Sequence, residues 1–343
     1  MLSLLPQLMP APQALIRNSR PLELAPAPGK VIGTKSGNVR DYVNHIAHLL
    51  HSREPLGDYH VRCELIEKQD RSGLVSAREW GSLALRSALG CAMSITLLVL
   101  SVQRGDGFAF FATLLLSSLS TMIGIGSRWT LKLNKRVSDR IVPQDRIVVK
   151  YPNGSFRIMI CKEDVARELY WHPETCHYRF GEGVYRFISL LGTLFLMVGV
   201  VCMGNATLEL QIGFGASYLI LNAVYWIVAA LPPKWFWDTD CYKVKKVLFR
   251  GGESNKTFTT ALWKAIVITG SVNWVRTGQV APVNKEWNSW LEMADQKIHY
   301  ERDDISEEYK FNDSQEHTFP KWDPEGALTQ CFDSSLSLPY RHA

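Results

Sequence analysis

The chain has 343 residues, 21% of them charged, and a formal net charge of +5 at pH 7. Its mean hydropathy of −0.06 resembles that of a soluble protein, yet four long windows, 87–103, 107–127, 187–208 and 210–233, contain no Asp, Glu, Lys or Arg. Basic residues gather beside these windows, not in runs interleaved with aromatic residues, so we expect no nucleic-acid-binding surface.

Residues 1–80 precede the first uncharged window and are predicted to be a largely disordered cytosolic region, because residues 1–38 are rich in proline and poor in aromatic residues. Pro6, Pro10 and Pro12 interrupt the apolar start of the chain, so we expect no cleaved signal peptide. A short amphipathic helix is predicted over 39–53.

The uncharged windows predict two transmembrane hairpins. About 20 helical residues cross a hydrocarbon core about 30 Å thick. The first hairpin, 81–127, has helices at about 83–102 and 108–127. The second, 187–231, has helices at about 187–204 and 212–231. Arg86 borders the first window, and its long side chain can reach the interface and extend the span.

Residues 128–186, between the hairpins, predict a small cytosolic α+β insertion. The β-branched runs 146–151 and 156–161 flank a turn at Asn153-Gly154, where positive φ is tolerated as in a type I′ hairpin. A helix over 162–172 follows, with Glu163 and Asp164 in its first turn. The fold class is therefore a mainly α membrane protein with a β-hairpin-plus-helix insertion.

The remainder, 232–300, predicts a cytosolic helical region. Residues 257–276 are apolar except around Lys264, which leaves a fifth span or an interfacial helix, and the lysine favours the latter. A helix over 284–300 carries one apolar face. The tail, 301–343, is acidic and predicted to be disordered.

Orientation follows from lysine and arginine, which favour the cytosolic side of a membrane. They gather before the first helix, after the second and after the fourth, whereas the two tight loops hold Arg104 alone. The termini and the insertion should therefore face the cytosol, in an endomembrane or the plasma membrane. Aromatic residues suited to the interface lie at the same helix ends: Trp80, Trp129, Tyr185, Trp235 and Trp237.

Candidate site residues are few, and the sequence predicts no catalytic or cofactor-binding group. Asn222, in the middle of the fourth span, is a substrate contact or, as we favour, a contact between helices. Asn205 begins an Asn-Ala-Thr acceptor for N-glycosylation in a predicted luminal loop.

Two histidine clusters offer metal ligands. His172, Cys176 and His177 lie close in sequence, and His45, His48 and His51 are spaced three apart on a predicted helix. Neither has the spacing of a known metal motif, so ordinary loop or solvated positions are the favoured interpretation. The seven cysteines, odd in number and without Cys-x-x-Cys, indicate reduced thiols.

Several stretches of the middle of the chain are familiar: Tyr-Pro-Asn-Gly at 151–154, Glu-Asp-Val-Ala-Arg-Glu-Leu-Tyr at 163–170 and the segments 105–133, 185–206 and 221–233. Through them, about residues 80–300 resemble a group of uncharacterised fungal four-helix, multi-pass membrane proteins. The resemblance implies a fungal source and a shared membrane architecture, and it implies no activity.

Three functions are compatible with these features. We favour a non-enzymatic scaffold or accessory protein that presents its cytosolic part to a protein partner, or to a second copy of itself, from the lipid bilayer. The alternative is an oligomeric transporter or channel for small molecules or lipids, lined by Asn222, Ser117, Thr121 and Asn205. The third is a membrane enzyme that uses His172, Cys176 and His177.

Overall fold

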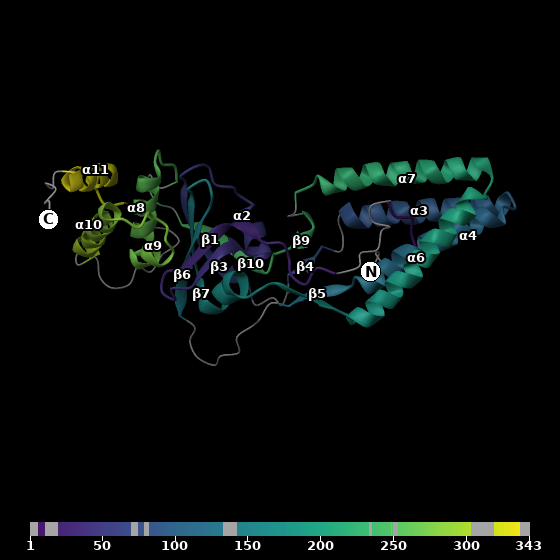
Figure 1. The fold of residues 1–343 in the computed structure, drawn as a ribbon, viewed down its shortest axis with the longest axis horizontal. Coiled ribbons are helices and arrows are strands. Elements are labelled where there is room, and N and C mark those ends of the chain that lie inside the picture. Colours follow the sequence, from purple (N-terminus) through teal and green to yellow (C-terminus); the bar gives the residue numbers. More distant parts are fainter. Residues whose placement is uncertain are drawn as a thin grey trace, which may run out of the picture. The chain divides into compact units, whose positions relative to one another are not determined.

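The computed structural model describes residues 6–10, 20–69, 75–78, 82–132, 143–232, 235–247, 249, 253–302 and 319–336. The chain forms two compact units (Figure 1). We call the first the helical unit (1–24, 73–132 and 175–239) and the second the sheet unit (25–72, 133–174 and 240–343). Several predicted features lie outside the described residues, among them Trp80 and most of the tail.

The helical unit is built on α3 (Ser82–Gln103), α4 (Gly107–Gly126), α6 (Glu182–Gly204) and α7 (Leu208–Ala229). At 1.5 Å per residue, helices of 20–23 residues extend about 30–35 Å. All four are long and apolar enough to cross a membrane, which confirms the four predicted apolar helices.

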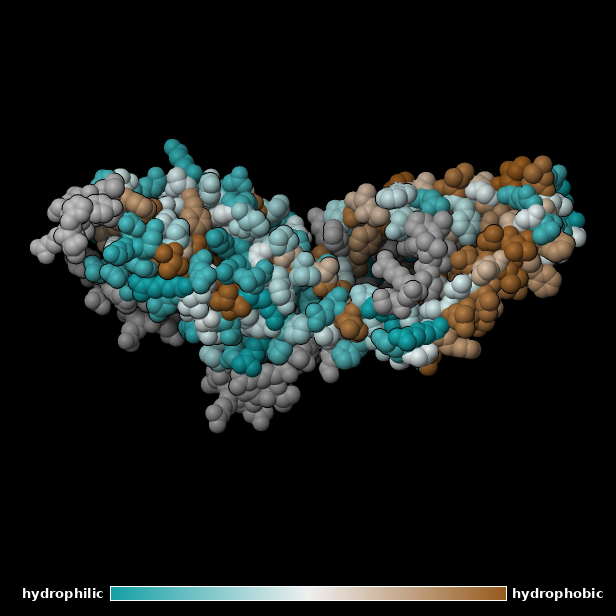
Figure 2. Space-filling view, in the orientation of Figure 1, coloured by the Kyte–Doolittle hydropathy of each residue, from teal (hydrophilic) through white to brown (hydrophobic). Residues whose placement is uncertain are grey.

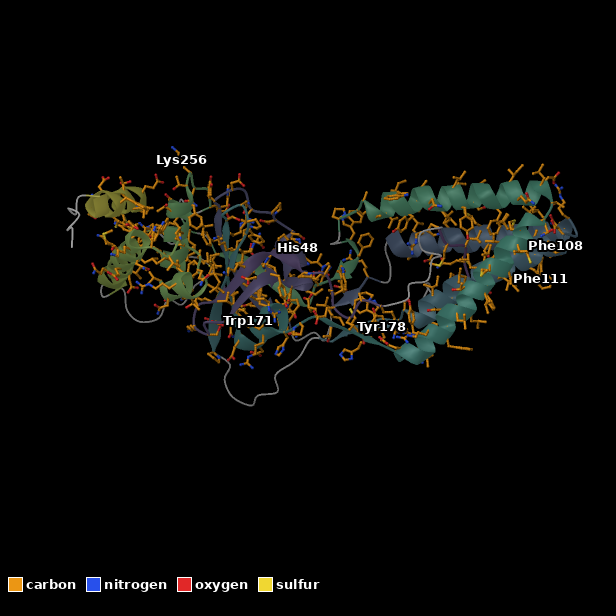
Figure 3. The ribbon with its side chains drawn as sticks, viewed as in Figure 1. His48, Phe108, Phe111, Trp171, Tyr178 and Lys256 are labelled. Atoms are coloured by element: carbon orange, nitrogen blue, oxygen red, sulfur yellow. The ribbon has the colours of Figure 1, made fainter. Side chains whose placement is uncertain are left out.

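Large apolar side chains lie on the outside of these helices. Figure 2 shows hydrophobic surface gathered over them, and Figure 3 shows Phe108 and Phe111 pointing away from α4. Such a surface is unfavourable in water but suits lipid. Its most exposed members include Phe187, Leu190, Val201, Leu208, Ile212, Leu219 and Ile227.

The helices pack through small residues. α4 packs along α6, and α3 packs along both α4 and α7. A Cβ atom added at Gly199 of α6 would lie 2.8 Å from Leu116 of α4, so glycine permits this close approach. The hydroxyls of Ser94 and Ser117 share a hydrogen bond between α3 and α4.

The unit is completed by two short strand pairs. These are β4 (Ser76–Ala77) with β9 (Trp237–Asp238), and β5 (Trp129–Lys132) with β8 (Thr175–Tyr178).

Residues 6–10 lie inside the helical unit. The Gln7 N–H donates to the Ser120 hydroxyl at 3.0 Å, and the Leu8 N–H donates to the Gly90 carbonyl at 3.2 Å. Leu8 is 2% exposed and packs with Leu97 and other apolar side chains of the helices. These contacts satisfy the backbone N–H groups of Gln7 and Leu8 among apolar helices.

Gly90→Ala should release this segment. The new Cβ would lie 2.6 Å from the Leu8 carbonyl oxygen, although alanine by itself favours the helix. We expect hydrogen exchange at the Gln7 and Leu8 amides to accelerate about tenfold or more. Gly215→Ala is the matched control, because nothing lies within 4 Å of its added Cβ. Equal exchange in the two variants would contradict the placement of the segment.

The sheet unit contains a six-stranded sheet of order β10-β3-β7-β6-β1-β2. Its strands are β1 (Ala27–Gly33), β2 (Val39–Val43), β3 (Val61–Lys68), β6 (Gln144–Lys150), β7 (Phe156–Lys162) and β10 (Tyr242–Val247). β3 and β7 pair in parallel and the other neighbours are antiparallel. The sheet thus joins three distant parts of the chain.

The predicted hairpin over 146–161 is confirmed by β6 and β7. Its loop is Pro152-Asn153-Gly154, closed by the Tyr151 N–H to the Ser155 carbonyl at 3.0 Å. Gly154 has a φ of +74° whereas Asn153 does not have positive φ, so the turn is a three-residue loop ending in a left-handed glycine instead of type I′. The predicted helix over 162–172 is α5 (Glu163–Ala166) followed by a π-helical turn, η2 (Arg167–Trp171).

The structure differs from the sequence prediction at both ends of the chain. Residues 27–68, predicted as largely disordered, supply β1, β2, β3 and α2 (His45–His51). Part of the predicted disordered tail forms α11 (Pro324–Leu336), which buries Ala327 and Cys331 in the core. The predicted insertion is therefore not a domain of its own, because its sheet is completed by strands that precede and follow all four apolar helices.

Helices cover both faces of the sheet. Phe156, Ile158 and Ile160 of β7 pack with α8 (Phe258–Thr269), α9 (Asn273–Thr277) and α10 (Lys285–Arg302), together with α11. The alternate residues of β7, Arg157 and Met159 among them, point to the other face, where α2, α5 and η2 lie. Alternation of side chains explains why every residue of 156–161 is buried.

Helix α8 corrects the prediction for 257–276. It has 12 residues and extends about 18 Å, too short to span a membrane. Leu262, Trp263 and Ile266 are at most 2% exposed within the sheet unit's core, so the segment is neither a fifth span nor an interfacial helix.

Helix α10 confirms the predicted apolar face of 284–300, with Trp287, Trp290, Leu291, Ala294 and Ile298 buried.

Candidate functional site

A buried polar network lies on the α2 side of the sheet. His51, 2% exposed, ends α2, and Tyr151 and Tyr170 come from the hairpin and from η2. The His51 Nδ1 lies 2.6 Å from the Tyr151 hydroxyl and its Nε2 lies 2.9 Å from the Tyr170 hydroxyl. A neutral imidazole satisfies both, since one ring nitrogen donates and the other accepts.

The electrostatics of this network favour neutral groups. Burial lowers the pKa of His51 well below its ordinary value, and the charge of Arg157 lowers it further. Burial also raises the pKa of Tyr151 to about 12 and that of Tyr170 well above its ordinary value. At neutral pH all three groups are therefore uncharged hydrogen-bond partners.

Arg157 and Glu64 form a buried ion pair beside the network. Their side chains are 2% and 4% exposed, and Arg157 Nη1 donates to Glu64 Oε1 at 2.6 Å. Arg157 Nη2 also donates to the carbonyls of His51 and Glu54, at 3.2 and 2.6 Å. The pair therefore ties β7 and β3 to the end of α2.

A cavity of about 350 Å³ opens against these residues. The Nδ1 atom of His48 is buried with no hydrogen-bond partner among the described residues (Figure 3 labels His48). The Ser52 and Ser155 hydroxyls donate to the Leu49 carbonyl and to Asn153, so neither is activated by a base. The cavity is lined by His48, His51, Ser52, Tyr151, Asn153, Ser155, Arg157, Leu56 and three prolines.

Glu174 predicts a pH dependence of stability. Its carboxylate accepts the N–H groups of His45 at 2.8 Å and Ile46 at 2.9 Å, yet burial raises its pKa to about 7, against the lowering effect of those N–H bonds and of Arg40. A raised folded pKa means that the folded state holds the proton more tightly than the unfolded state. The contribution of Glu174 to stability should therefore be greatest below the unfolded pKa near 4.5 and fall as pH rises through about 7.

Glu174→Gln keeps the side-chain shape and does not titrate. We expect the loss of stability between about pH 5 and about pH 7.5 to be smaller in this variant than in the natural chain. Chemical unfolding of both proteins at the two pH values measures the difference. The same pH slope in both would contradict the role of Glu174.

Of the residues singled out from the sequence, His48 and His51 line the cavity described above, and the others do not join them. Asn222 donates to the Tyr218 carbonyl of its own helix at 3.0 Å, and Asn205 donates to the Val201 carbonyl at 2.8 Å at the end of α6. His172 belongs to the sheet unit, whereas Cys176 and His177 lie on β8 of the helical unit. Within the described parts of the chain, no three His, Cys, Asp or Glu side chains are placed to hold a metal.

The two tight loops of the helical unit are joined to each other. Asp106 caps α4 by accepting the Ala109 N–H at 3.0 Å, and its other oxygen accepts the Thr207 N–H at 2.7 Å. Arg104 forms an ion pair with Glu209. Both loops therefore lie at the same end of the four helices.

Sequence reasoning did not identify the His51 network. Its members are separated by 100 and 119 residues, and no local pattern marks Tyr151 or Tyr170 as partners of a histidine. The one available signal was the placement of His51 on a predicted helix beside the apolar Leu50.

Comparisons of this chain with family models, curated proteins and solved structures find no match, so the resemblance to fungal membrane proteins stays a prediction.

Proposed function

We propose that this protein is a multi-pass membrane scaffold or accessory protein that holds its sheet unit at the cytosolic surface for a protein partner. One observation supports this above the others. A sheet covered by helices on both faces, with its own core, belongs to the same chain as four apolar helices of membrane length.

The proposed orientation is supported by charge. Arg86, Arg128 and Lys132 lie at the helix ends away from the two tight loops. The end that holds the loops has one basic residue, Arg104, together with the acidic Asp106 and Glu209. The rings of Trp129 and Trp237, 6.0 Å apart, lie at the same end as the basic residues. Indole rings favour the membrane interface, and basic residues favour the cytosol.

Transport is less well supported. The polar side chains proposed to line a path are engaged elsewhere: Asn222 in its own helix, Asn205 at the loop end and Ser117 with Ser94. If reconstituted Asn222→Leu carried the same flux as the natural chain, Asn222 would have no role in transport. Ion-coupled carriers normally have acidic or basic side chains in the middle of their membrane helices. The described helices of this chain have none there.

The test is affinity purification of the full chain from membranes after chemical cross-linking. The hairpin segment alone is unsuitable, because its sheet needs β1, β3 and β10. The comparison uses the natural chain, Arg157→Leu, which should destabilise the sheet unit, and Arg53→Ala, an exposed control. We expect partner recovery to be equal for the natural chain and Arg53→Ala and reduced for Arg157→Leu, although all three chains stay in the membrane fraction. Identical proteins from all three would contradict the proposal.

A further inference from the structure

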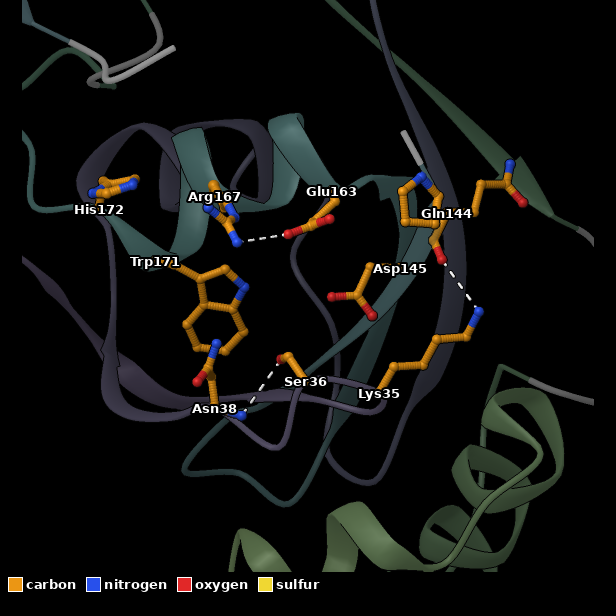
Figure 4. Close-up of a pocket in the computed structure, with 10 residues that line it drawn as sticks. Lys35, Ser36, Asn38, Gln144, Asp145, Glu163, Arg167, Trp171 and His172 are labelled. Atoms are coloured by element: carbon orange, nitrogen blue, oxygen red, sulfur yellow. Dashed lines mark hydrogen bonds and ion pairs between the residues drawn. The ribbon is translucent and has the colours of Figure 1, made fainter. Parts of the chain in front are cut away.

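A second cavity of the sheet unit, about 430 Å³, lies between the β1–β2 turn, the start of β6 and the end of η2 (Figure 4). Its walls come from Lys35, Asn38, Asp145, Glu163, Arg167 and Trp171, among others. Figure 4 shows the Trp171 indole and the Asp145 carboxylate pointing into the same space. None of these residues takes part in the His51 network.

The backbone around the tryptophan is held by several hydrogen bonds. It ends the π-helical turn η2, a rare conformation that is frequent at functional sites. Arg40 donates to the Trp171 carbonyl, and the Asn44 amide donates to the carbonyls of Leu169 and His172 at 2.9 and 2.8 Å. A pre-set aromatic wall lowers the ordering cost of binding.

Asp145 is a buried carboxylate without an ion-pair partner among the described residues. It is 6% exposed, and its Oδ1 accepts the Arg146 N–H at 2.8 Å. The cations of the cavity are engaged elsewhere, since Lys35 Nζ donates to the Gln144 carbonyl at 3.3 Å and Arg167 pairs with Glu163 at 2.7 Å. Burial raises the pKa of Asp145, opposed by the Arg146 N–H and the Lys35 charge, which is the behaviour of a carboxylate short of a counter-charge.

We propose that this cavity binds a small organic cation, an ammonium or guanidinium group whose N–H bonds go to the Asp145 carboxylate while its charge lies against the Trp171 ring. A carboxylate accepts several N–H bonds, and one of its acceptor positions is already used. An aromatic face attracts a cation within about 6 Å of its centre. An anion would meet the Asp145 charge, and Arg167 is already paired with Glu163.

The test uses single-charge probes on the full protein in detergent. n-Butylammonium and n-butylguanidinium are titrated by ligand-observed NMR, with n-butanol as the neutral probe of the same length. We expect the cations to bind with a dissociation constant of about millimolar order, as suits so few atoms. The butanol signal should show no saturation.

Two substitutions separate the carboxylate from the ring. Asp145→Asn keeps the acceptor for Arg146 and removes the charge, and it should weaken both cations about tenfold or more; Trp171→Leu should weaken them about threefold to tenfold. Asp41→Asn is the matched control, because this carboxylate is 85% exposed and pairs with Lys30. Unfolding curves establish that each variant is folded. Equal binding of butanol and butylammonium, or undiminished binding by folded Asp145→Asn, would overturn the proposal.

Discussion

Arg157→Leu should lower the free energy of unfolding of the sheet unit by about 3–5 kcal/mol, because it leaves Glu64 buried without its partner. The Glu64 carboxylate is 4% exposed and takes a 2.6 Å bond from Arg157. The carbonyls of His51 and Glu54 lose a donor in the same step. Urea unfolding followed by circular dichroism measures the change.

Two controls give this prediction its specificity. Arg53→Ala removes an ion pair whose side chains are 43% and 76% exposed, and exposed pairs contribute at most about 1 kcal/mol. The double variant Arg157→Leu with Glu64→Leu should recover much of the loss, because it leaves no buried charge unpaired. If the free energy of unfolding of Arg157→Leu alone were within about 1 kcal/mol of that of the natural chain, Glu64 would not be buried as described.

Trp290→Ala should cost about 3–5 kcal/mol, the usual range for removing a large aromatic side chain from a core. Trp290 is fully buried, its ring lies 5.4 Å from Trp287 and 5.6 Å from Trp322, and its Nε1 donates to the Pro324 carbonyl at 2.8 Å. Urea unfolding gives the cost, and hydrogen exchange over 324–336 should show α11 losing protection.

Phe332→Ala is the matched control for Trp290→Ala. Phe332 lies on α11 and is 40% exposed, so truncating it removes an aromatic ring without opening a core cavity. We expect a cost below about 1 kcal/mol. If Trp290→Ala were no more costly than Phe332→Ala, α11 would not belong to the folded core.

The membrane helices could be predicted because their signal is local. An uncharged window of about 20 residues needs no knowledge of its neighbours, and α4 and α7 begin within a few residues of their predicted starts. The hairpin at Asn153-Gly154 and the apolar face of α10 were equally visible. The turn type was not, because Asn153 could equally have taken positive φ.

The rest of the sheet depends on contacts that sequence patterns do not record. β3 alternates poorly, since both of its faces are covered and the charged Glu64 is buried against Arg157, 93 residues away. Its neighbours β7 and β10 lie beyond the first and the second membrane hairpins. Helix α11 buries few large apolar residues, so its sequence resembles a solvated tail.

The two candidate histidine clusters, which the sequence did not favour as metal sites, are not brought together as metal ligands in the described residues. Cys176 and His177 are consecutive on a strand, and consecutive side chains point to opposite faces. His45, His48 and His51 do share a helix, but His51 turns inward to two tyrosines that sequence distance had hidden.

Protease digestion of sealed membrane vesicles whose cytosolic side faces outward tests the central claim most directly. Mass spectrometry should recover two protected fragments, one covering α3 with α4 and the other α6 with α7, while peptides of the sheet unit are lost. Complete digestion of all four helices would show that they do not span the membrane, and a protected sheet unit would reverse the orientation.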